Sequence, residues 1–334
     1  MTESETIAVQ SGLLAGHLPF LVKPDSEVLW KNCLDRLHTL IHENLEKYGG
    51  ILLRGFQVDG EEDFQAFAQS FGFELLNYDY ASTPRAEVRT GVYTSTEYPA
   101  HQIIPLHNEQ AYTRSWPMKI WFHCITASEQ GGETPIVDSR LVYQSIDPAI
   151  RRKFIDNGLL YVRNYGNGLD LPWQKAFSTD DPAAVENFCR ANEIEFEWKT
   201  DGELRTRQRC QAVSVHPRTG ETVWFNQAHL FHVSNLQPHV RETLLSIVDE
   251  ADLPRNVYYG DGSAIDETDL DHVREVLQRH QVSFPWQSGD ILMLDNMLVA
   301  HGRNRFQGER KIVVAMAEPV VNGSLVKESN HVTA

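Results

Sequence analysis

Residues 289–303 read GDILMLDNMLVAHGR, and the next apolar run, at residues 310–319, reads RKIVVAMAEP. Each run is short, rich in apolar side chains and bounded by Gly, Arg or Pro, which is typical of buried strands. Similar runs stand earlier in the chain, with VYTSTEY at 92–98, KIWFHCI at 119–125 and TPIVD at 134–138. We therefore expect strands from both ends of this region to form one sheet system around helical inserts.

Helices are predicted before and within this strand-rich region. Apolar residues at three- and four-residue steps from Trp30 to Leu45 predict an amphipathic helix that ends at Gly49. A buried strand, ILLRGF at 51–56, and a second helix that Asp59 can cap follow it. The segment VSVHPRTGETVWFN predicts a hairpin around Arg218-Thr219-Gly220. Helical spacing of apolar residues predicts further helices at about 148–156, 181–191, 237–249 and 268–280.

Length and composition indicate an ordinary globular protein. We expect a single domain over residues 16–321, between a flexible N-terminal segment (1–15) and a polar C-terminal tail (322–334). The 30 Lys and Arg against 46 Asp and Glu give a net charge of −16, which disfavours nucleic acid and anionic membranes as partners. The four cysteines lack the spacing of a zinc site or a disulfide framework. Since no apolar run is long enough to span a bilayer, we expect a cytoplasmic protein.

A possible metal site begins at Pro105-Leu106-His107-Asn108-Glu109. Side chains two positions apart on a strand share a face, so His107 and Glu109 can reach one ion. His301, at the end of the apolar run MLVA, can supply a second imidazole. Two histidines and a carboxylate on one side of a metal form the facial triad of iron(II) oxygenases, although such a set also holds zinc, manganese or cobalt. The alternative interpretation is a surface polar pair.

Two further residues suit a cosubstrate that carries a carboxylate. Arg310 lies nine positions after His301, and its guanidinium can bind a carboxylate through two parallel hydrogen bonds. Thr134, in Gly131-Gly132-Glu133-Thr134, can add a hydroxyl donor. The alternatives are an exposed cation at a strand end and a turn hydroxyl.

Together these motifs resemble the TauD/TfdA family of Fe(II)/2-oxoglutarate-dependent dioxygenases. The resemblance covers most of the chain. Within the family, the sequence is most similar to SyrP-type hydroxylases of peptide-antibiotic biosynthesis. The family resemblance rests on GVYTSTEYP, LHNE, GGETPIVD, HPRTGETVWFN and LDNMLVAHGRNRF. The similarity to SyrP-type hydroxylases rests on YTSTEYP, LHNE, RNYGNGLDLPWQ at 163–174 and YYGDGS at 258–263.

The resemblance implies a fold, a site and a chemistry. The fold would be mostly β with α decoration: a double-stranded β-helix, or clavaminate synthase-like jelly roll, with a large helical insert among the 194 positions between His107 and His301. Iron(II) would bind His107, Glu109 and His301, and 2-oxoglutarate would bind Thr134 and Arg310, with O2 as the second cosubstrate. The taurine enzyme has Asp at the position of Glu109, whereas SyrP-like and clavaminate-synthase-like relatives have Glu. Related halogenases have a small residue there, so halogenation is disfavoured.

The expected reaction is hydroxylation of an unactivated C–H bond of an amino acid, or of an aminoacyl group on a peptidyl carrier protein, in secondary metabolism. Desaturation, epoxidation or cyclisation at the same iron centre is one alternative, and a non-catalytic jelly-roll binding protein is another. No catalytic base is assigned, and the oligomeric state is left open. Arg205, Arg207 and Arg209 alternate on one expected strand, as a solvated face or an anion-binding strip. Candidate substrate contacts are Tyr80, Arg85, Arg163, Trp173, Arg207, Asn226 and Arg303.

Overall fold

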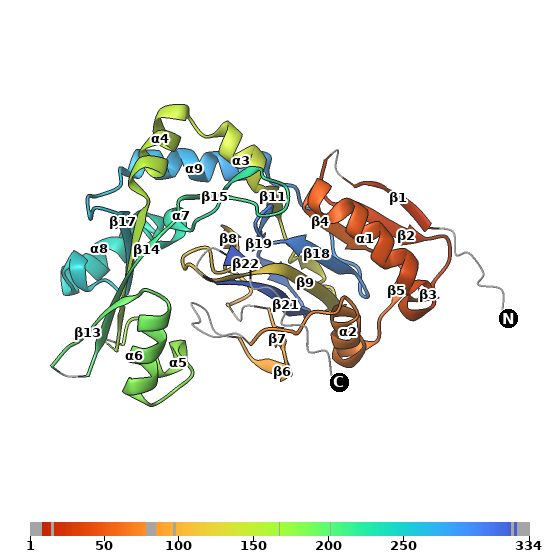
Figure 1. Cartoon of the computed structure of the whole chain (residues 1–334), viewed down its shortest axis with the longest axis horizontal. Helices are drawn as coiled ribbons and strands as arrows, with labels where there is room; N and C mark the ends of the chain where they lie inside the picture. Colours follow the sequence, from red (N-terminus) through yellow and green to blue (C-terminus); the bar gives the residue numbers. More distant parts are fainter. Residues whose placement is uncertain are drawn as a thin grey trace, which may run out of the picture.

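A nine-stranded sheet forms the centre of the chain (Figure 1). The computed structural model describes residues 9–14, 17–77, 85–95, 98–166, 168–200, 202–321 and 324–325. Strands in the sheet follow the order β1-β2-β4-β18-β9-β21-β7-β6, and β22 pairs with β21. Only the β2–β4 pair is parallel among the described neighbours of this sheet. The strands are β1 (Val9–Leu13), β2 (Phe20–Pro24), β4 (Gly50–Leu53), β6 (Glu87–Arg89), β7 (Val92–Thr94), β9 (Trp116–Thr126), β18 (Ile291–Asp295), β21 (Lys311–Val321) and β22 (Ser324–Leu325).

Both faces of the nine-stranded sheet are covered, which explains why its central strands are continuously apolar. On β9, Trp121 packs toward the N-terminal helices η1 (Trp30–Cys33), α1 (Leu34–Tyr48) and α2 (Gly60–Gln69). Its neighbours Ile120 and Phe122 point to the opposite face, into the interior of the jelly roll. The short parallel pair β3 (Val28–Leu29) and β5 (Phe56–Gln57) accompanies these helices.

A second, three-stranded sheet closes the jelly roll. Its order is β11-β19-β8, with bounds β8 (Ile104–His107), β11 (Ile136–Asp138) and β19 (Val299–Arg303). One apolar cluster contains Phe122 and Val314 of the large sheet together with Ile136 and Val299 of the small sheet. The two sheets therefore share one core, as two face-packed sheets do. A short two-stranded sheet pairs β10 (Gln130–Gly131), which precedes β11 in the chain, with β20 (Phe306–Gln307), which follows β19.

The segment between β11 and β18 is the large insert, and it contains a sheet of its own. Four antiparallel strands follow the order β13-β14-β12-β17. Their bounds are β12 (Leu159–Tyr165), β13 (Glu195–Trp198), β14 (Leu204–Cys210) and β17 (Arg255–Tyr259), and the hairpin is β15 (Val213–Val215) with β16 (Thr222–Trp224). The helices are α3 (Ser139–Ser145), α4 (Pro148–Asn157), α5 (Trp173–Ala176), α6 (Pro182–Ala191), α7 (Ala228–Phe231), η2 (Val233–Asn235), α8 (Pro238–Ile247), η3 (Glu250–Asp252) and α9 (Glu267–His280).

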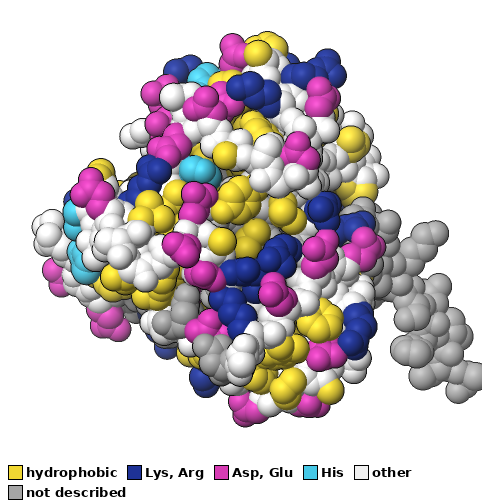
Figure 2. Space-filling model, turned by 90° about the vertical axis from the view of Figure 1, so that its left-hand side faces the viewer, with side chains coloured by type: hydrophobic (Ala, Val, Ile, Leu, Met, Phe, Trp, Pro, Cys, Tyr) yellow, Lys and Arg dark blue, Asp and Glu magenta, His cyan; other side chains and the backbone are white. Residues whose placement is uncertain are grey.

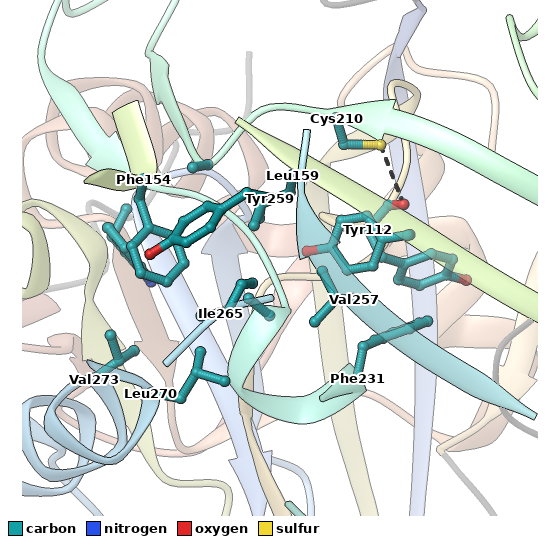
Figure 3. Close-up of a cluster of buried hydrophobic side chains, with 14 of the residues drawn as sticks. Tyr112, Phe154, Leu159, Cys210, Phe231, Val257, Tyr259, Ile265, Leu270 and Val273 are labelled. Carbon is teal, nitrogen blue, oxygen red and sulfur yellow. Dashed lines mark hydrogen bonds between the residues drawn. The ribbon is translucent and has the colours of Figure 1, made fainter. Parts of the chain in front are cut away.

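Apolar side chains from distant parts of the insert form its core (Figure 3). Phe154 of α4 contacts Tyr259 of β17, with ring centroids 5.4 Å apart. Tyr112, which follows the strand β8, packs against Phe231 of α7 at 5.0 Å, and the Cys210 thiol donates to the Tyr112 carbonyl at 3.4 Å. The insert is thus packed directly onto the segment that leaves β8.

The structure confirms the predicted jelly roll, the hairpin and all four helices predicted in the insert. Asp59 occupies the N-cap position of α2, but its side chain makes no capping bond. Instead the Asp63 carboxylate accepts a hydrogen bond from the Asp59 N–H. Residues 9–13 of the predicted flexible segment form β1 against β2, because extended backbone there completes the edge of the large sheet. None of the helices in the described part of the chain combines the length and apolar character needed to cross a bilayer.

Candidate metal centre

His107 and His301 face each other across two paired strands. The register of β8 and β19 places them directly opposite, and their ring centroids lie 4.6 Å apart. Opposite residues of an antiparallel pair project to the same face, which explains why positions so distant in sequence converge. Glu109 follows β8 by two residues, and its Oε2 lies 3.9 Å from His301 Nε2. One ligand atom from each of the three side chains lies within 4.8 Å of the others.

The chemistry of these donors fits a divalent transition metal. The His107 Nδ1 lies 2.8 Å from the Pro105 carbonyl, so this nitrogen carries the proton and Nε2 keeps its lone pair for a metal. Burial, together with His107 and Arg85 nearby, holds the pKa of His301 well below its ordinary value, so this ring is neutral near pH 7. Bonds of about 2 Å at right angles put ligand atoms about 3 Å apart, so the three donors, within 4.8 Å of one another, would each move slightly inward to bind one ion. In the described part of the chain, no other cluster of three His, Cys, Asp or Glu side chains has this geometry.

A cavity beside the two histidines contains both residues predicted to bind 2-oxoglutarate, Thr134 and Arg310. The Arg310 Nε donates to the Gly132 carbonyl at 2.9 Å, and its Nη1 lies 3.4 Å from Ser95 Oγ. No carboxylate of the described residues forms an ion pair with Arg310. Burial, and secondarily Arg303, lowers the pKa of Arg310 to about 10, so the guanidinium remains charged near pH 7.

Neighbouring residues orient the side chains of Thr134 and Arg310, the two residues predicted to bind the cosubstrate. The Trp286 indole donates to Thr134 Oγ1 at 3.1 Å, which leaves the hydroxyl hydrogen of Thr134 available to another acceptor. Gly132 has φ +74°, and a Cβ there would lie 3.0 Å from Arg310 Cδ and 2.4 Å from Ser128 Oγ. A glycine at this position therefore lets the Arg310 side chain pass close to the backbone.

Two more arginines line the same cavity. Arg85 Nη2 donates to Glu109 Oε2 at 2.6 Å, and both side chains are about 95% buried. Arg303 donates to three backbone carbonyls, those of Tyr98, Pro99 and Gln102. With Arg310, three guanidinium groups line the cavity, and positively charged side chains suit an anionic ligand.

The other predicted substrate residues lie away from the lining of this cavity. Arg163 stacks on Tyr165 in the insert, Trp173 packs edge-on against Trp198, and Asn226 bonds the backbone of Ala212 and Ala228. Their role as substrate contacts stays a prediction, and Tyr80 lies outside the described residues.

Arg205, Arg207 and Arg209 share one face of β14, as predicted, and each lies within ion-pair distance of an acid. Arg205 pairs with Asp252, Arg207 with Glu197 at 3.3 Å and Arg209 with Glu195 at 2.7 Å. Figure 2 shows basic and acidic side chains close together on the corresponding side of the molecule. These pairs favour a solvated, charge-balanced face over an anion-binding strip.

Four other buried histidines have structural partners. His229 Nε2 bonds the Leu106 carbonyl at 2.8 Å, and His216 Nε2 bonds Asp295 at 3.1 Å. His232 bonds Ser234 Oγ, and His123 bonds the Asp290 carbonyl. Two residues at the centre had no sequence signal that we used: Trp286, which orients Thr134, and Asn296, whose side chain bonds the backbone of Glu109.

Comparison with known proteins identifies the family. Residues 22–316 match the sequence model of the taurine catabolism dioxygenase TauD, TfdA family. The chain belongs to this family. TauD, TfdA family proteins are iron(II)- and 2-oxoglutarate-dependent dioxygenases, and this chain is an enzyme of that class, with O2 as the second cosubstrate.

Relatives of the TauD, TfdA type match along most of their length. The dapdiamide synthesis protein DdaC of Enterobacter agglomerans is 43% identical over 283 residues, which cover 85% of this chain and 86% of DdaC. A clavaminate synthase-like protein of Arabidopsis thaliana is 31% identical over 293 residues, 84% of each chain. The structure of PvcB from Pseudomonas aeruginosa has a TM-score of 0.55 at 15% identity and 96% coverage of both chains, which shows a shared fold.

Proposed function

We propose that this dioxygenase hydroxylates an unactivated C–H bond of an amino acid or of an aminoacyl group. His107, Glu109 and His301 would hold the iron, and Arg310 and Thr134 would hold the distal carboxylate of 2-oxoglutarate. The observation that carries this proposal is the convergence of three donor atoms within 4.8 Å beside a cavity with a buried Arg310. Bound together, iron(II), 2-oxoglutarate and O2 supply the oxidant for the C–H bond and yield succinate and carbon dioxide.

Each side chain contributes through position and charge. The neutral rings of His107 and His301 and the Glu109 carboxylate leave the remaining metal positions open to cosubstrates. Arg310 binds one end of the diacid by charge-assisted hydrogen bonds, and Thr134 donates its hydroxyl hydrogen to the same carboxylate. Phe122, whose ring centroid lies 4.9 Å from that of His301, provides an apolar wall that keeps water from the reacting atoms.

The substrate class is supported by both the relatives and the cavity. DdaC is named for dapdiamide synthesis and shares 43% identity with this chain, which favours a substrate from secondary metabolism. The substrate would be a small molecule, and Arg303 at the cavity would attract the carboxylate of a free amino acid. A peptidyl carrier protein that presents an aminoacyl thioester is the other form of this proposal.

A second candidate reaction keeps the iron centre and ends in desaturation, epoxidation or cyclisation. A relative from Fischerella ambigua, 22% identical over 267 residues, is named as a synthase of an isocyanoethenyl indole, and the ethenyl group favours keeping this candidate. The mass of the product separates the two, since hydroxylation adds one oxygen whereas desaturation removes two hydrogens. A non-catalytic binding protein would form no succinate in response to any amino acid or aminoacyl carrier.

An anaerobic titration with iron(II) and 2-oxoglutarate tests the site. We expect a weak visible charge-transfer band in the wild-type protein and none in His301→Ala. His123→Gln is the matched control and should leave the band unchanged, because His123, a buried residue of β9, bonds the Asp290 carbonyl and lies outside the lining of the cavity. An unaltered band in His301→Ala would refute the assignment of the ligands.

A further inference from the structure

Asn296 makes hydrogen bonds with both backbone groups of Glu109. Its Oδ1 accepts from the Glu109 N–H at 2.7 Å, and its Nδ2 donates to the Glu109 carbonyl at 2.9 Å. The second Nδ2 hydrogen bonds the Pro117 carbonyl at 2.8 Å. An asparagine amide has two donor hydrogens and one acceptor oxygen, so every hydrogen-bonding group of this side chain is in use. The residue is fully buried.

Glu109 depends on this side chain because it lies beyond the end of β8. The ladder between β8 and β19 ends at His107, and no backbone–backbone hydrogen bond of Glu109 occurs among the described residues. The following residue, Gln110, turns the chain away with φ 56°. Buried N–H and C=O groups without a partner are costly, so the Asn296 amide replaces the strand partner that Glu109 lacks.

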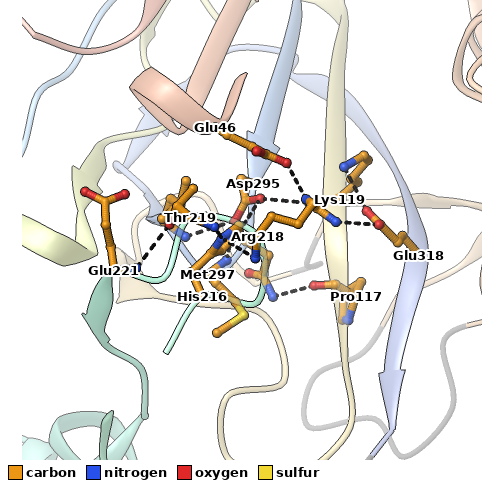
Figure 4. Close-up of polar contacts among 12 residues, drawn as sticks. Glu46, Pro117, Lys119, His216, Arg218, Thr219, Glu221, Asp295, Met297 and Glu318 are labelled. Atoms are coloured by element: carbon orange, nitrogen blue, oxygen red, sulfur yellow. Dashed lines mark hydrogen bonds and ion pairs between the residues drawn. The ribbon is translucent and has the colours of Figure 1, made fainter. Parts of the chain in front are cut away.

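The turn that carries Asn296 is itself held by buried polar groups (Figure 4). Asp295 Oδ1 accepts from the N–H groups of Met297 and Leu298 at 3.0 and 3.1 Å, and its Oδ2 lies 3.1 Å from His216 Nε2. The Asn296 carbonyl accepts from Asn108 Nδ2 at 2.6 Å. Because these hydrogen bonds fix the turn on both sides, the Asn296 side chain has a defined position, and its two bonds to Glu109 fix the backbone of that residue.

We infer that Asn296 is a positioning residue for the iron ligand Glu109, and that metal affinity depends on its amide. The inference rests on the proposed assignment of His107, Glu109 and His301 as ligands. By fixing the backbone of Glu109 at two points, Asn296 sets the direction in which the carboxylate meets the two imidazoles and Arg85. Partners that orient metal ligands typically change metal affinity by about 10–100-fold when they are removed.

The variant Asn296→Asp tests this inference with little change in shape. The new carboxylate can still accept from the Glu109 N–H, but it presents an acceptor to the carbonyls of Glu109 and Pro117, which repel it. Asn164→Asp is the matched control. Asn164 is also buried, donates to the carbonyls of Ala251 and Leu253, and accepts from Arg205 Nε, all within the insert.

The measurements are the dissociation constant of anaerobic iron(II), the visible spectrum of the cobalt(II) form, and near-UV circular dichroism as a test of folding. We expect iron(II) to bind about 10–100-fold more weakly to Asn296→Asp, with a shifted cobalt spectrum. Asn164→Asp should bind within about twofold of wild type, even if its melting temperature falls. If Asn296→Asp fails to fold, Asn296→Ser is judged by the same measurements.

The outcomes separate this inference from the proposed function. If a folded Asn296 variant has wild-type affinity and the wild-type cobalt spectrum, the inference is overturned while the ligand assignment stands. If the Asn164 control loses affinity as strongly as the Asn296 variant, general destabilisation explains the loss and the inference is also overturned. If wild type binds no metal, or if His301→Ala binds it equally well, the ligand assignment itself fails.

Discussion

Arg310 of the jelly-roll cavity and the arginines of the insert sheet are placed in opposite ways. Arg310 is buried, and none of the described carboxylates forms an ion pair with it. Arg207 on β14 is partly exposed and lies 3.3 Å from Glu197. In the insert sheet, an acidic side chain therefore balances the charge of Arg207, whereas no described carboxylate pairs with Arg310 in the cavity. A buried cation without an ion-pair partner is costly unless a ligand supplies the anion, which supports the proposal that Arg310 binds 2-oxoglutarate.

The largest expected effect comes from removing the unbalanced charge. Arg310→Ala should raise the dissociation constant of 2-oxoglutarate by at least about 30-fold, since truncating one partner of a buried charged pair costs roughly 2–5 kcal/mol. Isothermal titration of the anaerobic metal-loaded enzyme measures it. Arg207→Ala is the matched control and should bind 2-oxoglutarate as wild type does. Equal losses in both variants would abolish the distinction between the two regions.

The second-largest expected effect is a loss of folding stability at acid pH. It arises at His229, where the insert contacts the strand β8. Burial lowers the pKa of His229 to about 4, whereas an unfolded histidine titrates near 6.5. The unfolded chain therefore binds the extra proton first as the pH falls. The stability from this group is complete above pH 6.5 and is lost as the pH falls toward 4, by up to about 3 kcal/mol.

The variant His229→Gln removes this titration and can keep the hydrogen bond to the Leu106 carbonyl. We expect its melting temperature to fall less than that of wild type between pH 7.5 and pH 5. His239→Gln, at an exposed position of α8, should retain the wild-type difference. An identical pH dependence in His229→Gln and wild type would contradict this source of acid sensitivity.

The third expected effect is a higher Michaelis constant for 2-oxoglutarate when Thr134 loses its hydroxyl. Thr134→Val preserves shape but removes the hydroxyl that accepts from Trp286 and would donate to 2-oxoglutarate. A hydrogen bond to a charged group is worth about 1.5–3 kcal/mol, so the Michaelis constant for 2-oxoglutarate should rise by roughly tenfold or more. Thr134→Ser should restore most of the affinity. A wild-type constant in the valine variant would remove Thr134 from the cosubstrate site.

The smallest effect is expected in the insert. Arg207→Glu exchanges attraction for repulsion across β13 and β14, at a partly exposed position where an ion pair is worth only about 0.2–1 kcal/mol. Its melting temperature should fall by a few degrees at most, and its kinetics should match wild type. A large loss of substrate use with normal iron binding would instead restore the anion-binding hypothesis for this strand.

The sequence predicted the structural features that depend on the periodicity of nearby residues. It did not predict the features that depend on contacts between distant segments. Strand geometry accounts for the meeting of His107 and His301, which lie opposite each other on β8 and β19. The predicted two-residue strand step does not extend to Glu109, because β8 ends at His107 and the backbone of Glu109 is held by Asn296 instead. Charge balance is not a local property, so the sequence could not show that Arg207 has an acidic partner while no described carboxylate pairs with Arg310. The role of Asn296 depends on a turn 187 positions away from Glu109 and could not be inferred from either segment.

The separate sheet of the insert was also only partly predicted. The strand that carries Arg205, Arg207 and Arg209 was expected, but the pairing of β12 with both β14 and β17 joins segments far apart in the chain. The predicted hairpin, β15 with β16, is a separate two-stranded sheet. The predicted cap at Asp59 is wrong: its side chain makes no capping bond, and the Asp63 carboxylate accepts from the Asp59 N–H instead.

The pairing of β8 with β19 has a consequence for biosynthesis. His301 is made 194 residues after His107, so a chain that has been synthesised only as far as the insert contains two of the three proposed donors. Under the proposed ligand assignment, a message truncated between these positions would encode a product that lacks the third donor. Iron binding at this site would then require the pairing of β19 with β8, after the insert has been made.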